Sequence, residues 1–186
     1  MEKFKHVRPT KEYEGDAIAY INEFYKYNSK INGVGGLYKF LDNYDGWLDR
    51  LESDRNAVFS ENKVPTETFF LVRSNDNCIV GMINIRFALN ERLKMHGGNI
   101  GYSIRPTERG KGYAKIALFL ALKECSYLGL TRVLITAEDN NVPSYRTIEA
   151  LGGVMENKVL DDGKYFRRYW ICLLYTSPSP RDPKTS

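Results

Sequence analysis

The segment Asn99–Ile135 constrains the fold more than any other part of the sequence, because its apolar pattern changes from strand to helix and back to strand. A predicted strand at Asn99–Arg105 is followed by a long predicted helix from about Gly112 to Leu128, and Gly129 occupies the usual position after a helix end. The continuous apolar run Val133–Ile135 has the pattern of a strand covered on both faces in a parallel pairing. Strand, helix and strand form a βαβ unit, so we predict a fold of the α/β (α+β) class.

Strands and amphipathic helices are also predicted on both sides of this unit. Before it, the apolar spacings predict a strand, two helices and an antiparallel hairpin: Phe4–Arg8, Lys11–Tyr27, Leu37–Ser53, Thr66–Arg73 and Cys78–Phe87. After it they predict a helix and two strands, the strands joined by the turn sequence Asp161-Asp162-Gly163: Pro143–Leu151, Val154–Leu160 and Lys164–Leu173. A mixed sheet with helices packed against it follows.

The second strand of the hairpin has two different predicted faces. Alternation places a mainly apolar set on one face: Ile79, Gly81, Ile83, Ile85 and Phe87. Met82, Asn84 and Arg86 share the other face. Polar residues there can border a cleft, but a solvated strand face is the more common arrangement.

Size and composition indicate one globular domain. The chain has 186 residues, of which 42% are hydrophobic and 13% aromatic, far from the composition of disordered chains. We assign residues 1–174 to a single domain and expect residues 175–186, rich in Ser, Pro and charge, to form a disordered tail. The tail resembles translated adaptor or vector sequence, so its native origin is left open.

Charge, cysteine content and hydropathy exclude several classes of protein. A net charge of +4 permits an anionic ligand but is too small and too evenly spread for a dedicated nucleic-acid binder. The three cysteines lack the spacings of zinc sites and disulfide frameworks, so we expect no metal. No apolar stretch reaches the length of a membrane span and no signal sequence is evident, so we expect a cytoplasmic protein without a membrane partner.

The segment Arg105–Ala114 carries the clearest chemical pattern. A strand ends, a loop containing Gly110 and Gly112 turns, and a helix begins. The first amides of a helix have no intrahelical partner and lie at the positive end of its dipole. The glycines allow close approach of the backbone, while Arg109 and Lys111 add positive charge. The pattern indicates a site for an anion such as a pyrophosphate, although two glycines also occur in a simple turn, and it lacks the residues of the P-loop and dinucleotide fingerprints.

Two signatures in the chain resemble those of the GNAT superfamily of N-acetyltransferases. Arg109, Gly112 and Ala114 match its acetyl-CoA signature: Gln or Arg, two residues, Gly, one residue, Gly or Ala. A second signature of the family is matched downstream by Asn141, Ser144, Glu149 and the turn Leu151-Gly152-Gly153. The order of predicted elements also agrees, and Gly81–Arg86, Gly101–Pro106 and Arg168–Ile171 look like a subgroup of predicted acetyltransferases without a named substrate.

The resemblance implies a fold and a binding mode for acetyl-CoA. The fold would be a mixed central sheet of about six to seven strands flanked by about four helices, with a splay between the fourth and fifth strands. The pantetheine arm would lie in that opening along the fourth strand, the pyrophosphate would bind the loop at Arg109, and an amide near Ser103 or Ile104 would polarise the thioester. The implied cofactor-binding residues are Ser103, Ile104, Arg105, Arg109, Gly110, Lys111, Gly112, Tyr113, Ala114, Asn141 and Ser144.

The implied reaction is transfer of an acetyl group to a primary amine by direct attack in a ternary complex. It requires a base, for which Glu91, His96 and Tyr102 are the candidates, and an acid for the leaving thiolate. Many family members carry a tyrosine acid where this chain has Ile148, so water or Ser144 would assist instead. The acceptor, a small molecule or a peptide, is not identified, and either a monomer or a homodimer is compatible with the sequence.

Two other functions compete with this one. The missing tyrosine is compatible with a module that binds acyl-CoA without catalysis. Lys164–Trp170 interleaves basic and aromatic residues, a pattern that suits single-stranded nucleic acid but also fits a plain edge strand. Whether the acidic residues gather into one cleft is likewise open from the sequence: Glu67, Glu91, Glu138 and Asp139.

Overall fold

The computed structural model describes residues 2–173 of the chain. The described part contains seven strands: β1 (Phe4–Val7), β2 (Thr66–Arg73), β3 (Cys78–Arg86), β4 (Ile100–Ile104), β5 (Arg132–Glu138), β6 (Val154–Asp161) and β7 (Lys164–Cys172). It also contains five α-helices: α1 (Glu14–Lys26), α2 (Tyr44–Arg55), α3 (Glu91–Met95), α4 (Tyr113–Tyr127) and α5 (Val142–Ala150). The predicted mixed α/β fold is confirmed, whereas the predicted tail at residues 175–186 lies outside the described residues.

The strands form two antiparallel sheets. The first has the order β1-β2-β3-β4 and the second the order β5-β7-β6. The hairpins at Thr66–Arg86 and Val154–Cys172 are confirmed, and Asp162 and Gly163 have the two positive φ angles, 46° and 73°, of a type I′ turn.

In the described part no helix is both long and apolar enough to cross a bilayer.

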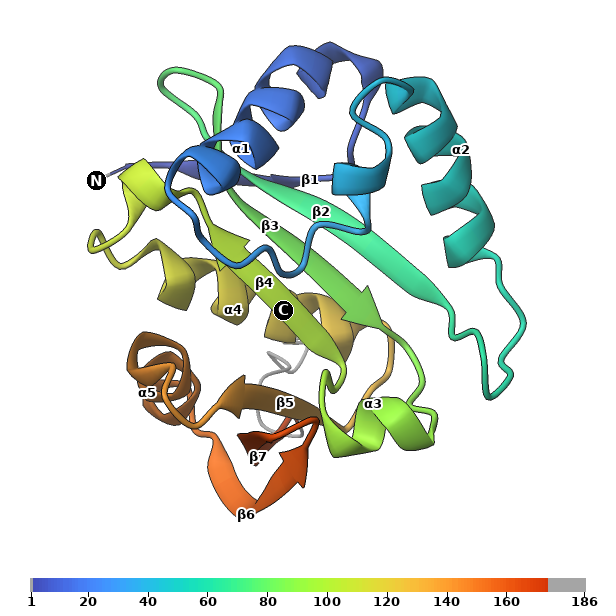
Figure 1. Ribbon diagram of the computed structural model, residues 1–186, viewed down its shortest axis with the longest axis vertical. Coiled ribbons are helices and arrows are strands. Elements are labelled where there is room, and N and C mark those ends of the chain that lie inside the picture. Colours follow the sequence, from blue (N-terminus) through green and yellow to red (C-terminus); the bar gives the residue numbers. More distant parts are fainter. Residues whose placement is uncertain (1, 174–186) are drawn as a thin grey trace, which may run out of the picture.

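Helices cover both faces of the first sheet (Figure 1). On one face α1 and α2 pack Tyr20, Phe24 and Trp47 against Phe70 and other residues of β2 and β3. On the opposite face α4 packs a set of small and apolar residues: Ala117, Leu118, Ala121, Leu122 and Cys125. They belong to a second cluster that continues through β5, β7 and α5. Because the second cluster includes residues of both sheets, α4 holds the two sheets together.

A bulge in β3 corrects the predicted faces of that strand. Leu71 of β2 pairs with Gly81, but the next residue, Val72, pairs with Ile79, so Val80 has no partner in β2. Ile79 consequently packs with α1 while Ile83 packs with α4, although simple alternation placed them together. The second face is not solvated either, since Asn84 is buried and donates to Thr68 Oγ1 at 3.0 Å.

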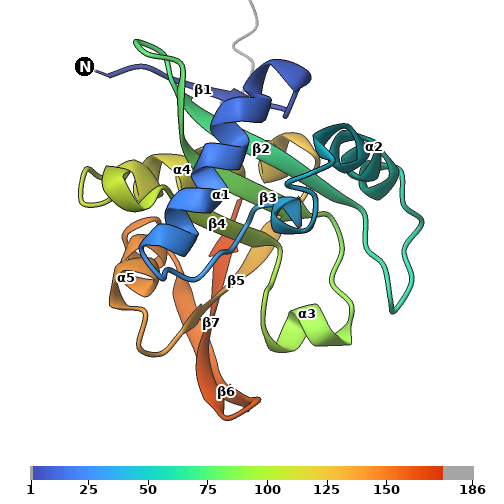
Figure 2. The same ribbon diagram turned by 45° about the horizontal axis from the view of Figure 1, so that its top comes forward.

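The second sheet corrects the interpretation of Lys164–Trp170 as an edge strand. β7 is the central strand, paired with β5 on one side and β6 on the other. Tyr169 is fully buried there and donates to Glu149 at 2.8 Å, while Arg168 donates to Glu156 at 2.5 Å. Figure 2 shows β6 and β7 extending away from the first sheet.

The predicted parallel pairing of Val133–Ile135 is also corrected. β5 forms its ladder with β7 in antiparallel orientation and has no ladder with β4. The two sheets meet instead at Asn99, whose backbone N–H donates to Leu134 O at 2.7 Å and whose side chain accepts from Leu134 N at 2.8 Å. Gly98 permits this approach, because a Cβ there would lie 2.3 Å from Leu134 O. Beyond Asn99, β4 and β5 diverge and belong to different sheets, as the predicted splay requires.

Three helical segments differ from the prediction. The helix predicted at Lys11–Tyr27 starts with a 3-10 turn at Lys11–Tyr13, and α1 begins at Glu14. The helix predicted at Leu37–Ser53 is interrupted: Leu37–Lys39 forms a 3-10 turn, and α2 begins at Tyr44 after Asn43, which accepts from Gly46 N at 3.0 Å. Asn43 therefore acts as an N-cap inside an apolar pattern that is continuous by spacing alone. The segment before β4, predicted as a loop, contains the short helix α3.

Candidate active site

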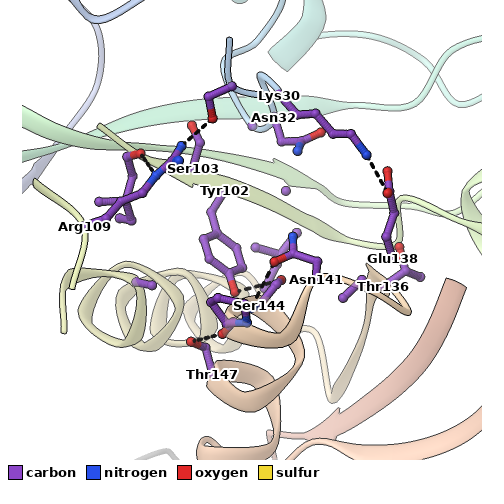
Figure 3. A pocket seen from close by; sticks show the side chains of 18 of the residues that line it. Lys30, Asn32, Tyr102, Ser103, Arg109, Thr136, Glu138, Asn141, Ser144 and Thr147 are labelled. Carbon is purple, nitrogen blue, oxygen red and sulfur yellow. Dashed lines mark hydrogen bonds and ion pairs between the residues drawn. The ribbon is translucent and has the colours of Figure 1, made fainter. Parts of the chain in front are cut away.

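A cavity of about 820 Å³ is lined by both sides of the splay. Its walls come from the segment before the 3-10 turn at Leu37, from β4, from the loop that leads into α4, from the end of β5 and from the start of α5. Figure 3 shows the labelled residues of these segments arranged around the same space. Segments from almost the whole length of the chain thus contribute to one site.

The loop before α4 presents unpaired backbone amides to this cavity. Gly110 and Gly112 have φ angles of 77° and 82°, and Gly112 is the residue that immediately precedes the helix. A Cβ at either glycine would meet no atom within 4 Å, so glycine is required for its conformation and not for space. Among the described residues, the amides of Gly110 to Ala114 meet no hydrogen-bond acceptor. These amides, at the positive end of the dipole of the 15-residue helix, lie where the sequence predicts an anion site.

The cationic residues near this loop have different environments. Arg109 lines the cavity; its Nε donates to Ile104 O at 3.1 Å, and its Nη2 donates to Ser29 Oγ at 2.8 Å. Lys111 pairs with Glu108 at 2.8 Å and is not among the lining residues. Arg105 pairs with Asp16 of α1 at 2.7 Å and also lies outside the cavity. Of the three, the structure thus brings only Arg109 to the site.

The backbone of β4 supplies further donors. Arg105 N donates to Val80 O and Arg86 N donates to Asn99 O, so the amides of Gly101 and Ser103 point toward β3 by the alternation of an antiparallel ladder. The amides of Tyr102 and Ile104 point the other way, toward the splay. The sequence predicted that an amide near Ser103 or Ile104 would polarise the thioester. Of these two amides, only that of Ile104 points toward the splay.

Tyr20 of α1 contacts β4 through its hydroxyl group. Its hydroxyl lies 3.0 Å from Ser103 O and 2.9 Å from Ser103 Oγ. The tyrosine is fully buried, and burial raises the pKa of its hydroxyl above the ordinary value. Ser103, although it borders the cavity, is thus held by α1.

The start of α5 forms the wall of the cavity that faces β4. Asn141 is the N-cap of this helix and accepts from Ser144 N at 3.4 Å. Ser144 Oγ lies 3.3 Å from the hydroxyl of Tyr102, and Figure 3 shows the tyrosine pointing across toward Ser144 and Thr147. Burial raises the pKa of Tyr102, so its hydroxyl stays protonated at neutral pH. Ile148 is fully buried in the core and is not a lining residue.

The far end of the cavity contains groups that sequence reasoning did not assign. Lys30 and Glu138 pair at 2.6 Å, as Figure 3 shows, and this pair holds the pKa of Glu138 below its ordinary value. Thr136 Oγ1 accepts from Gly97 N at 2.8 Å. Arg86 also lines this end. Two of these residues had been noted in the sequence: Arg86 as a polar residue on the mixed strand face, and Glu138 as one of the acidic residues that could gather into a cleft.

Among the three candidates for the base, two line the cavity. His96 stacks on Phe166 with ring centroids 4.9 Å apart, and its Nδ1 lies against the carboxylate of Asp161. Tyr102 lines the cavity as described above. Glu91, by contrast, has a side chain 78% exposed that pairs with Lys94, and it is not a lining residue.

The acidic residues do not gather into one cleft. Glu67 is buried away from the cavity and pairs with Arg8 and with Arg55, the latter at 2.9 Å. Asp139 pairs with Arg167 at 2.5 Å, and of the four acidic residues considered only Glu138 lines the cavity. Within residues 2–173, no cluster of His, Cys, Asp and Glu is arranged to hold a metal ion.

Comparison with known proteins gives one family and several relatives. A family model described as "Acetyltransferase (GNAT) domain" matches residues 8–154. The chain is 26% identical over 130 residues to "Uncharacterized N-acetyltransferase YnaD" of Bacillus subtilis (strain 168), an alignment that spans 66% of this chain and 74% of that protein.

Two solved structures share the fold over nearly the whole chain. Ribosomal-protein-S5-alanine acetyltransferase from Vibrio fischeri has a TM-score of 0.66 at 15% identity and covers 96% of this chain and 97% of that one. Spermidine N-acetyltransferase from Vibrio cholerae, in complex with CoA and spermine, has a TM-score of 0.65 at 14% identity and covers 91% and 95%. At such identities the likeness shows the fold alone.

Proposed function

The chain belongs to the GNAT acetyltransferase family, and we propose that it transfers an acetyl group from acetyl-CoA to a primary amine by direct attack in a ternary complex. The observation that carries this proposal is the set of unpaired amides between Gly110 and Ala114, which open into the same cavity as the outward-facing amides of β4. The two solved relatives are named for amine acceptors, and one of them holds CoA. These likenesses support acetyl-CoA as donor and an amine as acceptor.

We propose that the pyrophosphate binds the amides that precede α4, with Arg109 beside them. The pantetheine arm would run along β4 and bond to the outward-facing backbone of Tyr102 and Ile104, with Asn141 and Ser144 on the facing wall. The Ile104 amide would donate to the thioester oxygen as negative charge develops on it. This placement uses the backbone amides of the loop and of β4 that have no acceptor among the described residues.

The proton transfers are assigned to residues at the cavity. The neutral amine attacks the thioester carbon, the C–S bond breaks, and the thiolate leaves. We propose that His96, whose Nδ1 lies against the Asp161 carboxylate, takes the proton that the nitrogen loses. Tyr102, kept protonated by burial and adjacent to Ser144, would protonate the thiolate. Ile148 has no part in this scheme because it lies in the core.

Calorimetric titration with acetyl-CoA tests the cofactor site. Gly112→Val forces a β-branched residue into the left-handed region, at a cost of about 1–2 kcal/mol, and distorts the loop. We expect micromolar binding by the wild type and at least about tenfold weaker binding by this variant. Gly129→Val is the matched control: Gly129 has φ 87° at the other end of the same helix, so it carries the same strain but should leave binding unchanged. Equal effects of the two variants would contradict the proposed site.

The same preparation tests catalysis when a panel of primary amines is added. His96→Gln should lower kcat by about 100-fold with the acetyl-CoA Kd unchanged. Intersecting initial-velocity patterns are expected for a ternary complex, whereas a ping-pong pattern would contradict direct attack. Binding without turnover of any amine would favour the non-catalytic module.

A further inference from the structure

Arg86 lies at the end of β3, and its guanidinium is fixed beside the first residues of β4. Nη1 donates to Gly97 O and to Gly98 O, both at 3.1 Å. A Cβ placed on Gly101 would lie 3.4 Å from Nη2, which locates this nitrogen next to the β4 backbone. The residue is also part of the cavity wall. The two carbonyl contacts hold the planar group in one orientation, so its position does not depend on a ligand.

The positive charge of Arg86 has no carboxylate to balance it among the described residues. The other well-buried arginines are paired: Arg73 lies 2.7 Å from Glu108, and Arg105 lies 2.7 Å from Asp16. Arg86 forms no such pair. Burial, with a smaller contribution from nearby Arg92, lowers its pKa to about 10, so it remains charged at neutral pH. Because Arg86 is half-buried in the cavity wall, an anionic ligand there would balance a charge that no described carboxylate pairs with.

Part of the hydrogen-bonding capacity of Arg86 is also unused. A guanidinium has five N–H donors. Two of them go to the carbonyls of Gly97 and Gly98, and the structure gives no acceptor within residues 2–173 for those on Nε and Nη2. A guanidinium edge with two parallel donors matches a carboxylate, which it binds bidentately.

The position of Arg86 within the cavity separates it from the phosphate loop. The loop amides lie beyond the last residue of β4, Ile104, whereas Arg86 lies beside Gly101 at the start of that strand. His96 lines the same end, since Arg86 donates to the carbonyl of Gly97, the next residue in the chain. Acetyl-CoA that bound the loop and extended along β4 would leave this end for the acceptor.

We propose that the acceptor is an amine that also bears a carboxylate, such as a free amino acid or a short peptide, and that Arg86 binds this carboxylate. The inference rests on the proposed acetyl transfer and adds the class of acceptor to it. A polyamine is disfavoured, because its cationic chain would lie against an unpaired guanidinium. Arg86 is thus a specificity-determining residue and takes no part in the bond changes.

Matched pairs of acceptors test this proposal. The twenty standard L-amino acids and diglycine are compared with their C-terminal amides, which carry the same amine without the carboxylate, and with spermidine. Product is detected by mass spectrometry, and acetyl-CoA binding is measured in parallel by calorimetry. We expect turnover of one or more acids with kcat/KM at least about tenfold above that of the matching amide.

Arg86→Met then removes the charge while keeping a long side chain. For the accepted acid, kcat/KM should fall by about 100-fold, mainly through KM, and for the amide by less than about threefold. Arg92→Met is the matched control, since Arg92 is exposed and outside the cavity, and it should change neither acceptor by more than about twofold. An equal loss for acid and amide in Arg86→Met, with a lower melting temperature, would reduce Arg86 to a support for the Gly97–Gly98 turn and overturn the proposal.

The remaining outcomes are also decisive. Preference for amides or for spermidine, or no turnover of any acid by protein that binds acetyl-CoA, would overturn the acceptor class. Failure to bind acetyl-CoA at all would instead contradict the proposed function itself.

Discussion

His6 illustrates how one half-buried side chain makes the stability of this protein depend on pH. Its ring stacks on Phe69 with centroids 4.2 Å apart, and its Nε2 is buried without a hydrogen-bond partner among the described residues. Burial lowers the pKa of His6 from 6.5 to about 4, against an opposing effect of Glu67. The folded protein therefore holds this histidine neutral where an unfolded chain would protonate it.

We predict that stability falls as the pH is lowered from about 6.5 to 4. In that window the unfolded chain binds more protons at His6 than the folded chain does, so the free energy of unfolding rises with pH and this contribution is complete above 6.5. A shift of this size corresponds to at most about 3–4 kcal/mol. Urea denaturation of the wild type and of His6→Phe at pH 7, 5.5 and 4.5 measures it. The variant should have a flatter profile, and parallel profiles would contradict the assignment.

At the scale of single elements, two asparagines at helix starts differ in their expected roles. Asn43 caps α2 on the molecular surface, while Asn141 caps α5 at the cavity. Replacement of either by Ala removes a cap and should destabilise the fold by about 1 kcal/mol, with less loss at Asn141 because its contact is longer.

Only Asn141→Ala should also weaken acetyl-CoA binding, by about tenfold, because only this residue faces the proposed pantetheine site. Thermal denaturation and calorimetry on the two variants separate the effects. The same loss of affinity in Asn43→Ala would indicate a general effect of stability on binding and remove Asn141 from the site.

Helix boundaries also show how far local pattern extends. The helix α4 was predicted to within about a residue at each end because its stripe of small residues and the glycines on both sides all agree. The start of α2 was misplaced because the apolar spacing continues through Leu37 and Phe40, whereas the chain turns at Asn43 to cap a shorter helix. The spacing of apolar residues indicates which side chains can share one face of a helix. The residue at which the helix begins depends on the N-cap, here Asn43.

For the molecule as a whole, the junction between the two sheets is the decisive contact. Asn99 bonds Leu134 through both its backbone N–H and its side-chain oxygen, and its side-chain nitrogen donates to Arg86 O at 3.0 Å. It therefore joins β3, β4 and β5 at the closed end of the splay. The width of the opening depends on this junction as well as on the packing of α4.

We predict that Asn99→Ala lowers the free energy of unfolding by about 2–4 kcal/mol, because it leaves the buried Leu134 N–H without an acceptor. Acetyl-CoA binding should weaken even at temperatures where the variant stays folded, since β4 and β5 would no longer be held at a fixed separation.

Asn84→Ala is the control for that experiment. It also removes a buried hydrogen bond, to Thr68, but the bond lies within the first sheet. It should lower stability in urea denaturation without changing the affinity for acetyl-CoA measured on the folded protein. Equal losses of affinity in both variants would mean that the junction at Asn99 has no special part in holding the site open.

The local sequence was enough to predict those features of this protein that depend on residues close together in the chain. Alternation predicted the hairpins, and the two glycines before a helix with a small-residue stripe predicted the anion site. These features depend on residues that are neighbours in the chain, so the pattern contains all the information that they need. The match of Arg109, Gly112 and Ala114 to an acetyl-CoA signature belongs to the same category.

Tertiary structure alone decided which distant side chains meet. The bulge at Val80 reverses the face of Ile79, β7 becomes a central strand, and the pairing of Lys30 with Glu138 joins residues 108 positions apart. The environment of Arg86 likewise depends on the absence of any carboxylate near it in the described fold, which its own strand cannot specify. Burial and the meeting of charges arise from the packing of segments far apart in the chain, and for that reason the proposed acceptor end of the cavity could not be predicted from the sequence.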